Sequence, residues 1–348
     1  MWRICCVPDD SGSPDICPYA AKPENRTAGR PPAPGRTSGF FASASGAIPQ
    51  QAQVRFLPPL HTLWLTAPGV NVDEESGVFV RQPIAILDSG VGGLTVAKEV
   101  MRQLPRERIV YFGDTGRAPY GPRPAEEVIR FTREIVDFLA RFDPKLIVVA
   151  CNTATAYALE AIRPLVKAPV VGVILPGARA AVRRTATGTV GVIGTEGTIR
   201  SGAYERVLKA LSPRIEVVSL ACPMFVPIVE RGAFRTSETY RIVAETLAPL
   251  RRTAIDTLIL GCTHYPFLAD AISAAMGPDI ALISSAEETA RDISAILRET
   301  DRQSDGTDVP VHQFYCSGDP GLFQTIARQW LREQTAGVPI VWQVPCIR

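Results

Sequence analysis

The sequence predicts an α/β protein of two similar domains, each a parallel sheet flanked by helices. Three observations predict this class. Short apolar runs of four to six residues alternate with amphipathic stretches of helical period, a pattern typical of βαβ units and therefore of parallel sheets. The two halves of the chain also repeat one pattern of strand ends. Finally, the length of 348 residues suits about two domains of ordinary size.

The expected strands are the apolar runs, most of which end in Gly, Ser, Thr or Cys. In chain order they cover residues 84–87, 109–112, 146–150, 170–174, 190–193, 215–220, 257–260, 280–283 and 340–344. The clearest helical patterns cover residues 125–141, 236–252 and 286–300. So many strands fit two compact sheets better than one very wide sheet.

Composition separates an amino-terminal extension from the rest of the chain. Residues 1–80 contain 11 of the 30 prolines and show neither helical nor strand periodicity. We expect this extension to be disordered, because it cannot bury enough apolar surface to offset its chain entropy. The alternatives are a targeting or docking arm, or translated sequence upstream of the true start. The remaining chain is assigned to a first α/β domain, residues 81–176 plus 293–344, and a second, residues 177–292.

The internal repeat is a repeat of strand ends. In the first half, one strand ends in a small polar turn at Asp88 and a later strand ends at Cys151. In the second half, one strand ends at Thr195 and a later strand ends at Cys262. A duplicated unit of this kind places two thiols at equivalent strand ends, so we expect the active site in the cleft between the two domains.

Charge and cysteine content exclude several classes of protein. A formal net charge of +2 argues against a nucleic-acid surface, which concentrates Lys and Arg. No apolar stretch approaches the ~18 residues of a membrane span, and the amino terminus lacks the apolar core of a secretory signal. The eight cysteines are too dilute for a disulfide scaffold and form no C-x-x-C pair. We therefore expect a cytoplasmic protein that binds neither nucleic acid nor membranes.

Cys151 and Cys262 are the candidate reactive groups. Each follows an apolar strand, and α/β folds bind ligands at the carboxyl ends of parallel strands. Free N–H groups at a following helix start are expected to lower the pKa of a thiol. The alternatives are two buried cysteines that pack as small hydrophobic side chains, or a metal site completed by His264. A metal site is less favoured, because zinc sites supply closely spaced ligand pairs and the chain has only three histidines.

Two loops carry polar residues that suit a binding site. Residues 88–95 form a Gly-rich turn that matches neither the dinucleotide-binding fingerprint nor a P-loop. Its Asp88 carboxylate would repel a phosphate and suits an amine-bearing or proton-exchanging substrate better. Residues 113–122 form a long turn with a cation, a phenol and glycines, which is typical of functional loops and of plain solvated connections alike.

Two opposed thiols with a carboxylate, an imidazole and no cofactor motif suit the inversion of a stereocentre. Inversion requires a base on one face of a carbon and an acid on the other, because one group cannot easily reach both faces. A duplicated fold that contributes one cysteine from each half provides this near-mirror geometry.

Five motifs between residues 88 and 266 resemble those of the glutamate racemase family, and the resemblance covers about residues 83–344 in order. They are D-S-G-V-G-G-L-T-V at 88–96, G-D-T-x-R-x-P-Y-G at 113–121, A-C-N-T-A-T-A at 150–156, G-V-I-G-T-x-G-T-I at 191–199 and G-C-T-H-Y-P at 261–266. Together they are highly specific. Residues 1–80 lie outside the family's usual pattern.

The resemblance implies a role for each matching position. Cys151 and Cys262 match the two catalytic thiols, one of which takes the α-proton as a thiolate while the other donates a proton. Asp88 and His264 match groups that assist these thiols, and Glu230 matches a carboxylate that supports the histidine. Positions that hold the substrate's amino and carboxylate groups match Asp88, Ser89, Tyr120, Gly121, Asn152, Thr153, Thr263 and His264.

The same resemblance implies a homodimeric enzyme that interconverts L- and D-glutamate and supplies D-glutamate for peptidoglycan. Family members use no pyridoxal phosphate and no metal. Aspartate racemases are similar but carry C-T-E in the second half, so His264 after Thr263 favours glutamate. Two alternatives stay open: a racemase for aspartate or another amino acid, and a non-catalytic protein that holds an acidic metabolite or a partner protein in the same cleft.

Overall fold

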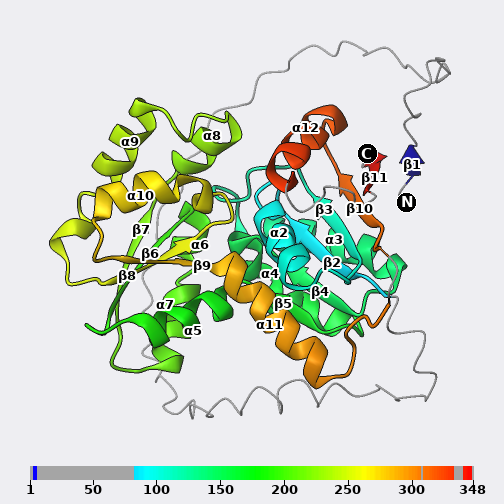
Figure 1. Ribbon diagram of the computed structural model, residues 1–348, viewed down its shortest axis with the longest axis horizontal. Coiled ribbons are helices and arrows are strands. Elements are labelled where there is room, and N and C mark those ends of the chain that lie inside the picture. The colour runs from blue at the N-terminus through cyan, green and yellow to red at the C-terminus, as the bar shows by residue number, and fades with distance from the viewer. Residues whose placement is uncertain (1–2, 6–81, 307–308, 333–339, 347–348) are drawn as a thin grey trace, which may run out of the picture. The chain divides into compact units, whose positions relative to one another are not determined.

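The computed structural model describes residues 3–5, 82–306, 309–332 and 340–346 (Figure 1). Most of the predicted extension, residues 1–80, lies outside the described residues, so its disorder stays a prediction. The exception is strand β1, Arg3–Cys5, which pairs antiparallel with strand β11, Ile340–Cys346.

The first sheet has seven strands in the order β1-β11-β10-β3-β2-β4-β5. Its remaining strands are β2 (Ile84–Asp88), β3 (Ile109–Gly113), β4 (Leu146–Val149), β5 (Val170–Gly172) and β10 (His312–Cys316). All neighbouring strands except β1 and β11 run parallel. Strands β2, β3 and β4 are buried throughout, because both faces of the sheet are covered, and this explains their continuous apolar sequence.

The second sheet has four parallel strands in the order β7-β6-β8-β9. They are β6 (Thr189–Gly194), β7 (Glu216–Ala221), β8 (Thr257–Gly261) and β9 (Ala281–Ser284). This order repeats β3-β2-β4-β5 of the first sheet, strand for strand along the chain. The repeat of strand ends in the sequence therefore corresponds to a repeated sheet topology.

Helices cover both faces of each sheet (Figure 1). The α-helices are α2 (Leu94–Gln103), α3 (Ala125–Leu139), α4 (Asn152–Ile162), α5 (Ile174–Arg184), α6 (Glu196–Arg200), α7 (Ala203–Leu211), α8 (Phe225–Glu230), α9 (Ser237–Leu247), α10 (Ala269–Met276), α11 (Ser285–Glu299) and α12 (Pro320–Leu331). Short 3-10 turns lie at Ala140–Phe142, Arg163–Leu165, Leu250–Arg252 and Tyr265–Leu268. No helix in the described part of the chain is both long and apolar enough to cross a bilayer.

Alternate residues of the first sheet pack against different helices. Ala85 and Leu87 of β2 belong to the core shared with α3 and α4. Tyr111 of β3 faces the other way and stacks on Phe323 of α12, with ring centroids 6.0 Å apart. Since both faces are packed, the polar ends of the strands are the places left for a binding site.

The α/β class with two parallel sheets is confirmed, and every expected strand is present. The sequence analysis missed β10, which lies between β11 and β3, because His312 and Gln313 interrupt its apolar run. The helical pattern at 236–252 is divided into α9 and a 3-10 turn at Leu250–Arg252, because Pro249 cannot continue a helix hydrogen bond.

The proposed domain boundaries at 176/177 and 292/293 fall inside helices α5 and α11. Helix α11 packs against both α2, which follows a strand of the first sheet, and α5, which packs on the second. Because these helices connect the two sheets, the exact boundaries stay a prediction.

A buried ion pair fixes the chain where it returns from α11 to the first sheet. Lys145, just before β4, has no exposed side-chain surface, and its Nζ lies 2.5 Å from Glu107 Oε2. The same Nζ donates a hydrogen bond to the Arg302 carbonyl at 2.7 Å, and the Ser304 N–H donates to Glu107 Oε1 at 2.8 Å. These contacts lie at the amino ends of the strands, away from the ends that carry the cysteines.

Candidate active site

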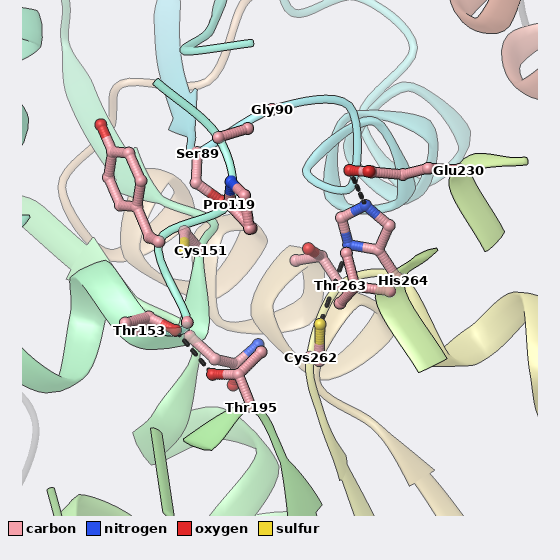
Figure 2. A pocket seen from close by; sticks show the side chains of 15 residues that line it. Ser89, Gly90, Pro119, Cys151, Thr153, Thr195, Glu230, Cys262, Thr263 and His264 are labelled. Atoms are coloured by element: carbon pink, nitrogen blue, oxygen red, sulfur yellow. Dashed lines mark hydrogen bonds and ion pairs between the residues drawn. The ribbon is translucent and has the colours of Figure 1, made fainter. Parts of the chain in front are cut away.

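Cys151 and Cys262 lie just beyond the carboxyl ends of β4 and β8, which are corresponding strands of the two sheets. Both cysteines are buried and unpaired. In Figure 2 they approach one pocket from different strands, Cys151 on the left and Cys262 on the right. Both thiols line the same pocket.

The pocket contains about 390 Å³ of space, counting the part that opens to solvent. It is lined by Ser89, Gly90, Ala118, Pro119, Tyr120, Gly121, Cys151, Asn152, Thr153, Thr195, Val226, Glu230, Cys262, Thr263 and His264. All of the site residues predicted from the sequence line it except Asp88, which is fully buried behind the lining.

A histidine and a glutamate accompany Cys262. His264 Nδ1 lies 3.8 Å from Cys262 Sγ, and His264 Nε2 lies 3.3 Å from Glu230 Oε1 (Figure 2). Burial by itself lowers the pKa of His264, but the contacts with Cys262 and Glu230 outweigh it and raise that pKa to about 10. This raised pKa favours the protonated, cationic form of His264 beside Cys262 Sγ. The ring of Trp330 from α12 stands edge-on to the imidazole, with centroids 6.4 Å apart.

The surroundings of Cys151 differ, because it is buried near the carboxylate of Asp88. Burial, and next the charge of Asp88, raise the pKa of Cys151 to about 12. The Ala154 N–H, at the start of α4, points at Cys151 Sγ at 3.4 Å and acts in the expected direction, lowering the pKa. The sequence-based expectation of a lowered thiol pKa is thus wrong for Cys151, because desolvation and a nearby anion outweigh the helix terminus.

Asp88 is itself held by the Gly-rich loop. The Gly90 N–H donates to Asp88 Oδ2 at 2.9 Å, while Oδ1 is buried without a hydrogen-bond partner in the protein. Burial raises the pKa of Asp88, and the nearby His264 charge opposes that shift. Asp88 therefore interacts electrostatically with groups on both sides of the pocket.

The Gly-rich loop also comes unusually close to the second cysteine's segment. A Cβ added at Gly92 would meet Thr263 Oγ1 and would lie 2.5 Å from His264 Nδ1. The Thr95 hydroxyl donates to the Thr263 carbonyl at 3.1 Å. Only a residue without a side chain allows this approach, so the loop carries glycine for close packing rather than for phosphate binding.

The turn at 113–121 is held by Asp114, a fully buried carboxylate. Asp114 accepts hydrogen bonds from Arg117 Nε at 2.7 Å, from Ser317 Oγ at 2.6 Å and from the hydroxyl of Tyr120. Tyr120 lines the pocket, but its hydroxyl proton is donated to Asp114. The pocket-facing position of Tyr120 and Gly121 is therefore set by a network outside the pocket.

Hydroxyl groups from both sheets meet at the floor of the pocket. Thr153 Oγ1 lies 2.8 Å from Thr195 Oγ1 (Figure 2) and 3.1 Å from Thr198 Oγ1. Nearby, the Gly197 N–H donates to the Gly121 carbonyl at 2.8 Å. The threonine contacts join α4 to the segment that follows β6, and the Gly121 contact joins the turn at 113–121 to that same segment.

The sequence analysis missed several lining residues, chiefly Thr195, Val226 and Pro119. A signal for Thr195 existed, since the repeat places it at the strand end that corresponds to Asp88 and Ser89. Pro119 lies inside the motif at 113–121 but was not singled out there, whereas Val226 is apolar and nothing in its spacing distinguishes it from a core residue. Within the described ranges, no group of three or more His, Cys, Asp or Glu side chains is arranged to hold a metal.

Two parallel sheets that each contribute one cysteine to a shared pocket define a class of α/β protein with paired thiols. Comparison with known proteins agrees with this class. Residues 93–293 match the model of the Asp/Glu/Hydantoin racemase family, and the chain belongs to this family of amino-acid racemases. It is 51% identical to the glutamate racemase of Bacillus cereus over 263 residues, which are 76% of this chain and 98% of that protein. It is 52% identical to the glutamate racemase of Enterococcus faecalis over 252 residues, 72% of this chain and 92% of that protein.

Two solved structures are also similar to this chain in fold and in sequence. The glutamate racemase isoform RacE1 from Bacillus anthracis superposes with a TM-score of 0.72 at 48% identity, covering 77% of this chain and 97% of that one. The glutamate racemase from Francisella tularensis, solved in complex with D-glutamate, superposes with a TM-score of 0.70 at 32% identity, covering 76% and 97%. Each of these four proteins is a glutamate racemase, and the alignment covers 92–98% of its length.

Proposed function

We propose that this protein interconverts L- and D-glutamate by moving the α-proton between two thiols, without a cofactor. The observation that carries the proposal is the pair Cys151 and Cys262, which reach one pocket from corresponding strands of a repeated sheet. A binding protein has no need of two opposed thiols, whereas inversion needs an acid and a base on opposite faces.

The proposed transfer conserves atoms and charge. One thiolate takes the α-proton and becomes a thiol, and the electron pair left on Cα delocalises into the adjacent carboxylate. The opposite thiol gives its proton to the other face of Cα and becomes the new thiolate. Because an α-proton is far less acidic than a thiol of pKa about 8.5, hydrogen-bond donors in a nearly closed pocket must stabilise the carbanionic transition state.

The polar neighbours suggest how protons are distributed before substrate binds. His264, whose pKa is raised to about 10 by contacts with Cys262 and Glu230, places a positive charge beside the Cys262 sulfur. Burial and Asp88 keep Cys151 protonated. We therefore assign Cys262 as the base and Cys151 as the acid in the resting enzyme; one turnover exchanges these roles.

The substrate's charged groups are assigned to the polar lining. Hydroxyl and amide groups of Ser89, Asn152, Thr153 and Thr263 are the side-chain contacts we expect for its carboxylate and amino groups, with Tyr120 and Gly121 contributing from the turn at 113–121 and Asp88 and His264 completing the set. The relatives named above are glutamate racemases, which supports glutamate as the substrate.

The resemblance to glutamate racemases extends the proposal to the cellular location, the oligomeric state and the biological role of the enzyme. We propose that it works in the cytoplasm as a homodimer and supplies D-glutamate for peptidoglycan, the cell-wall polymer of bacteria. Size-exclusion chromatography with light scattering tests the dimer directly.

The function is tested by following circular dichroism with L-glutamate, D-glutamate and L-aspartate, in parallel with deuterium uptake at Cα in D2O. We expect both glutamate enantiomers to converge on the racemate with solvent deuterium at Cα, and aspartate to react far more slowly. Faster racemisation of aspartate would replace the substrate assignment. Saturable glutamate binding without deuterium uptake would instead identify a binding protein.

A further inference from the structure

Asn152 presents an unpartnered donor to the pocket. It is the first residue of α4, it is 2% exposed, and it lines the pocket next to Cys151. Its Nδ2 is buried and has no hydrogen-bond acceptor in the protein. A buried amide that lacks an acceptor is costly, so this N–H2 group is poised for an acceptor on a bound molecule.

The other end of the same amide is held by a residue from the second sheet's side. The hydroxyl of Tyr204, on α7, donates a hydrogen bond to Asn152 Oδ1 at 2.7 Å. Tyr204 is 3% exposed and does not line the pocket. Burial raises the pKa of Tyr204 in spite of a hydrogen bond with Ser285, so the phenol stays protonated and can act as the donor.

The tyrosine ring has little freedom to move. A Cβ added at Gly261, the residue before Cys262, would lie 3.0 Å from Tyr204 Cε2. One added at Gly177 of α5 would lie 3.7 Å from the Tyr204 hydroxyl. Because Gly177 and Gly261 have no side chains, their backbone packs closely against the Tyr204 ring. This packing fixes the phenol oxygen in the position where it hydrogen-bonds Asn152.

A carboxamide can present either its oxygen or its nitrogen, since the two ends have almost the same shape. Because the Tyr204 hydroxyl donates its proton to Oδ1, the amide oxygen faces Tyr204 and the amide nitrogen is left toward the pocket. We propose that Tyr204 is a positioning residue that holds the Asn152 side chain with its N–H2 directed at a carboxylate of the substrate. The proposal rests on glutamate being the substrate.

The contact between Tyr204 and Asn152 also makes a binding group of the first domain depend on a residue of the second. Asn152 follows β4 of the first sheet, whereas Tyr204 follows β6 of the second. The orientation of the donor is thus maintained only while the segments after β4 and β6 are in contact, as the nearby Thr153–Thr195 hydroxyl pair also requires. Glutamate should therefore bind more weakly whenever this contact is broken.

The test is a double-mutant cycle on the whole protein with Tyr204→Phe, Asn152→Ala and the two combined, measuring KM and kcat for both glutamate enantiomers. Calorimetric binding of D-glutamate to the same four proteins gives a second readout that does not require activity. We expect Tyr204→Phe to raise KM and Kd about 10-fold, the worth of one buried hydrogen bond, with a smaller change in kcat. In the Asn152→Ala background the same substitution should change either constant less than about 2-fold.

Tyr265→Phe is the matched control. Tyr265 is fully buried, and its hydroxyl donates to the Cys222 carbonyl at 3.0 Å, so the substitution also removes one buried phenol hydrogen bond. Its effect should be the same with or without Asn152.

Equal effects of Tyr204→Phe in the two backgrounds, or an unchanged Kd, would overturn the proposal. If Tyr204→Phe weakens folding, far-UV circular dichroism reveals it and Kd per folded molecule still decides. Failure of the parent protein to bind glutamate would count against the proposed function rather than against the role of Tyr204.

Discussion

Cys151 and Cys262 occupy corresponding strand ends of a repeated sheet, yet their charged neighbours have opposite sign. Cys262 is paired with the cationic His264, whereas the carboxylate of Asp88 raises the pKa of Cys151. The duplication thus supplies two thiols in equivalent places, and divergence of their surroundings puts a cation beside one and a carboxylate near the other.

Replacing either thiol should abolish racemisation in both directions. Cys151→Ala and Cys262→Ala each remove the proton donor or acceptor on one face of the substrate, so we expect losses of more than about 1,000-fold in kcat. Circular dichroism measures the loss. Deuterium uptake separates the faces, because a variant that keeps one thiol can exchange the α-proton of one enantiomer only.

The matched control for these variants is Cys316→Ala. Cys316 is a buried free cysteine at the end of β10 and lies outside the pocket lining, so its loss should leave kcat within about 2-fold. Parent-like racemisation by both single active-site variants would disprove the two-thiol mechanism.

Glu230→Gln should narrow the pH range of activity from the alkaline side. Glu230 helps to raise the pKa of His264 to about 10, so the cation is present below that pH and is lost as pH rises through it. Without the carboxylate the pKa of His264 falls, and the alkaline limb of the kcat profile should move to lower pH by about one unit.

Glu245→Gln serves as the comparison, since Glu245 is an exposed residue of α9 paired with Arg241. Its pH profile should coincide with that of the parent. An unmoved alkaline limb in Glu230→Gln would show that Glu230 does not act on His264.

Gly92→Ala should lower activity because the added methyl group clashes with neighbouring side chains. The added methyl group would be forced against Thr263 Oγ1 and His264 Nδ1, displacing two groups of the pocket, and we expect kcat/KM to drop by about 100-fold. Gly321→Ala on α12, where the nearest contact of the new methyl is an ordinary 3.4 Å, should be close to neutral. Equal activity of the two variants would mean that the loop can shift without consequence.

Lys145→Met should destabilise the fold without changing the chemistry. It leaves Glu107, which is 3% exposed, as an unpaired buried carboxylate, and we expect a loss of about 3 kcal/mol in the free energy of unfolding. Urea denaturation measures this loss, while kcat of the folded enzyme should stay within about 2-fold. Adding Glu107→Gln should restore part of the stability, because the neutral amide no longer requires a cation; no recovery would mean that the ion pair is not the cause.

The sequence by itself determined the strands, their alternation with helices and the two cysteines at strand ends, because these are properties of local apolar period and of neighbouring residues along the chain. The motifs around Asp88, Cys151 and Cys262 were readable for the same reason. The sequence pattern did not predict strand β10. The strand is buried because it lies between β3 and β11, and not because apolar and polar residues alternate along it.

Tertiary structure alone decided which distant groups act on each thiol. Asp88 lies far from Cys151 along the chain, and Trp330 reaches His264 from a helix that follows a different sheet. The raised pKa of Cys151 depends on burial and on that carboxylate, while its local sequence, a helix start, predicts the opposite. Likewise, nothing near Asn152 in the sequence indicates that Tyr204 fixes its amide. Electrostatic and hydrogen-bond partners are set by distance in space, and chain order does not encode that distance.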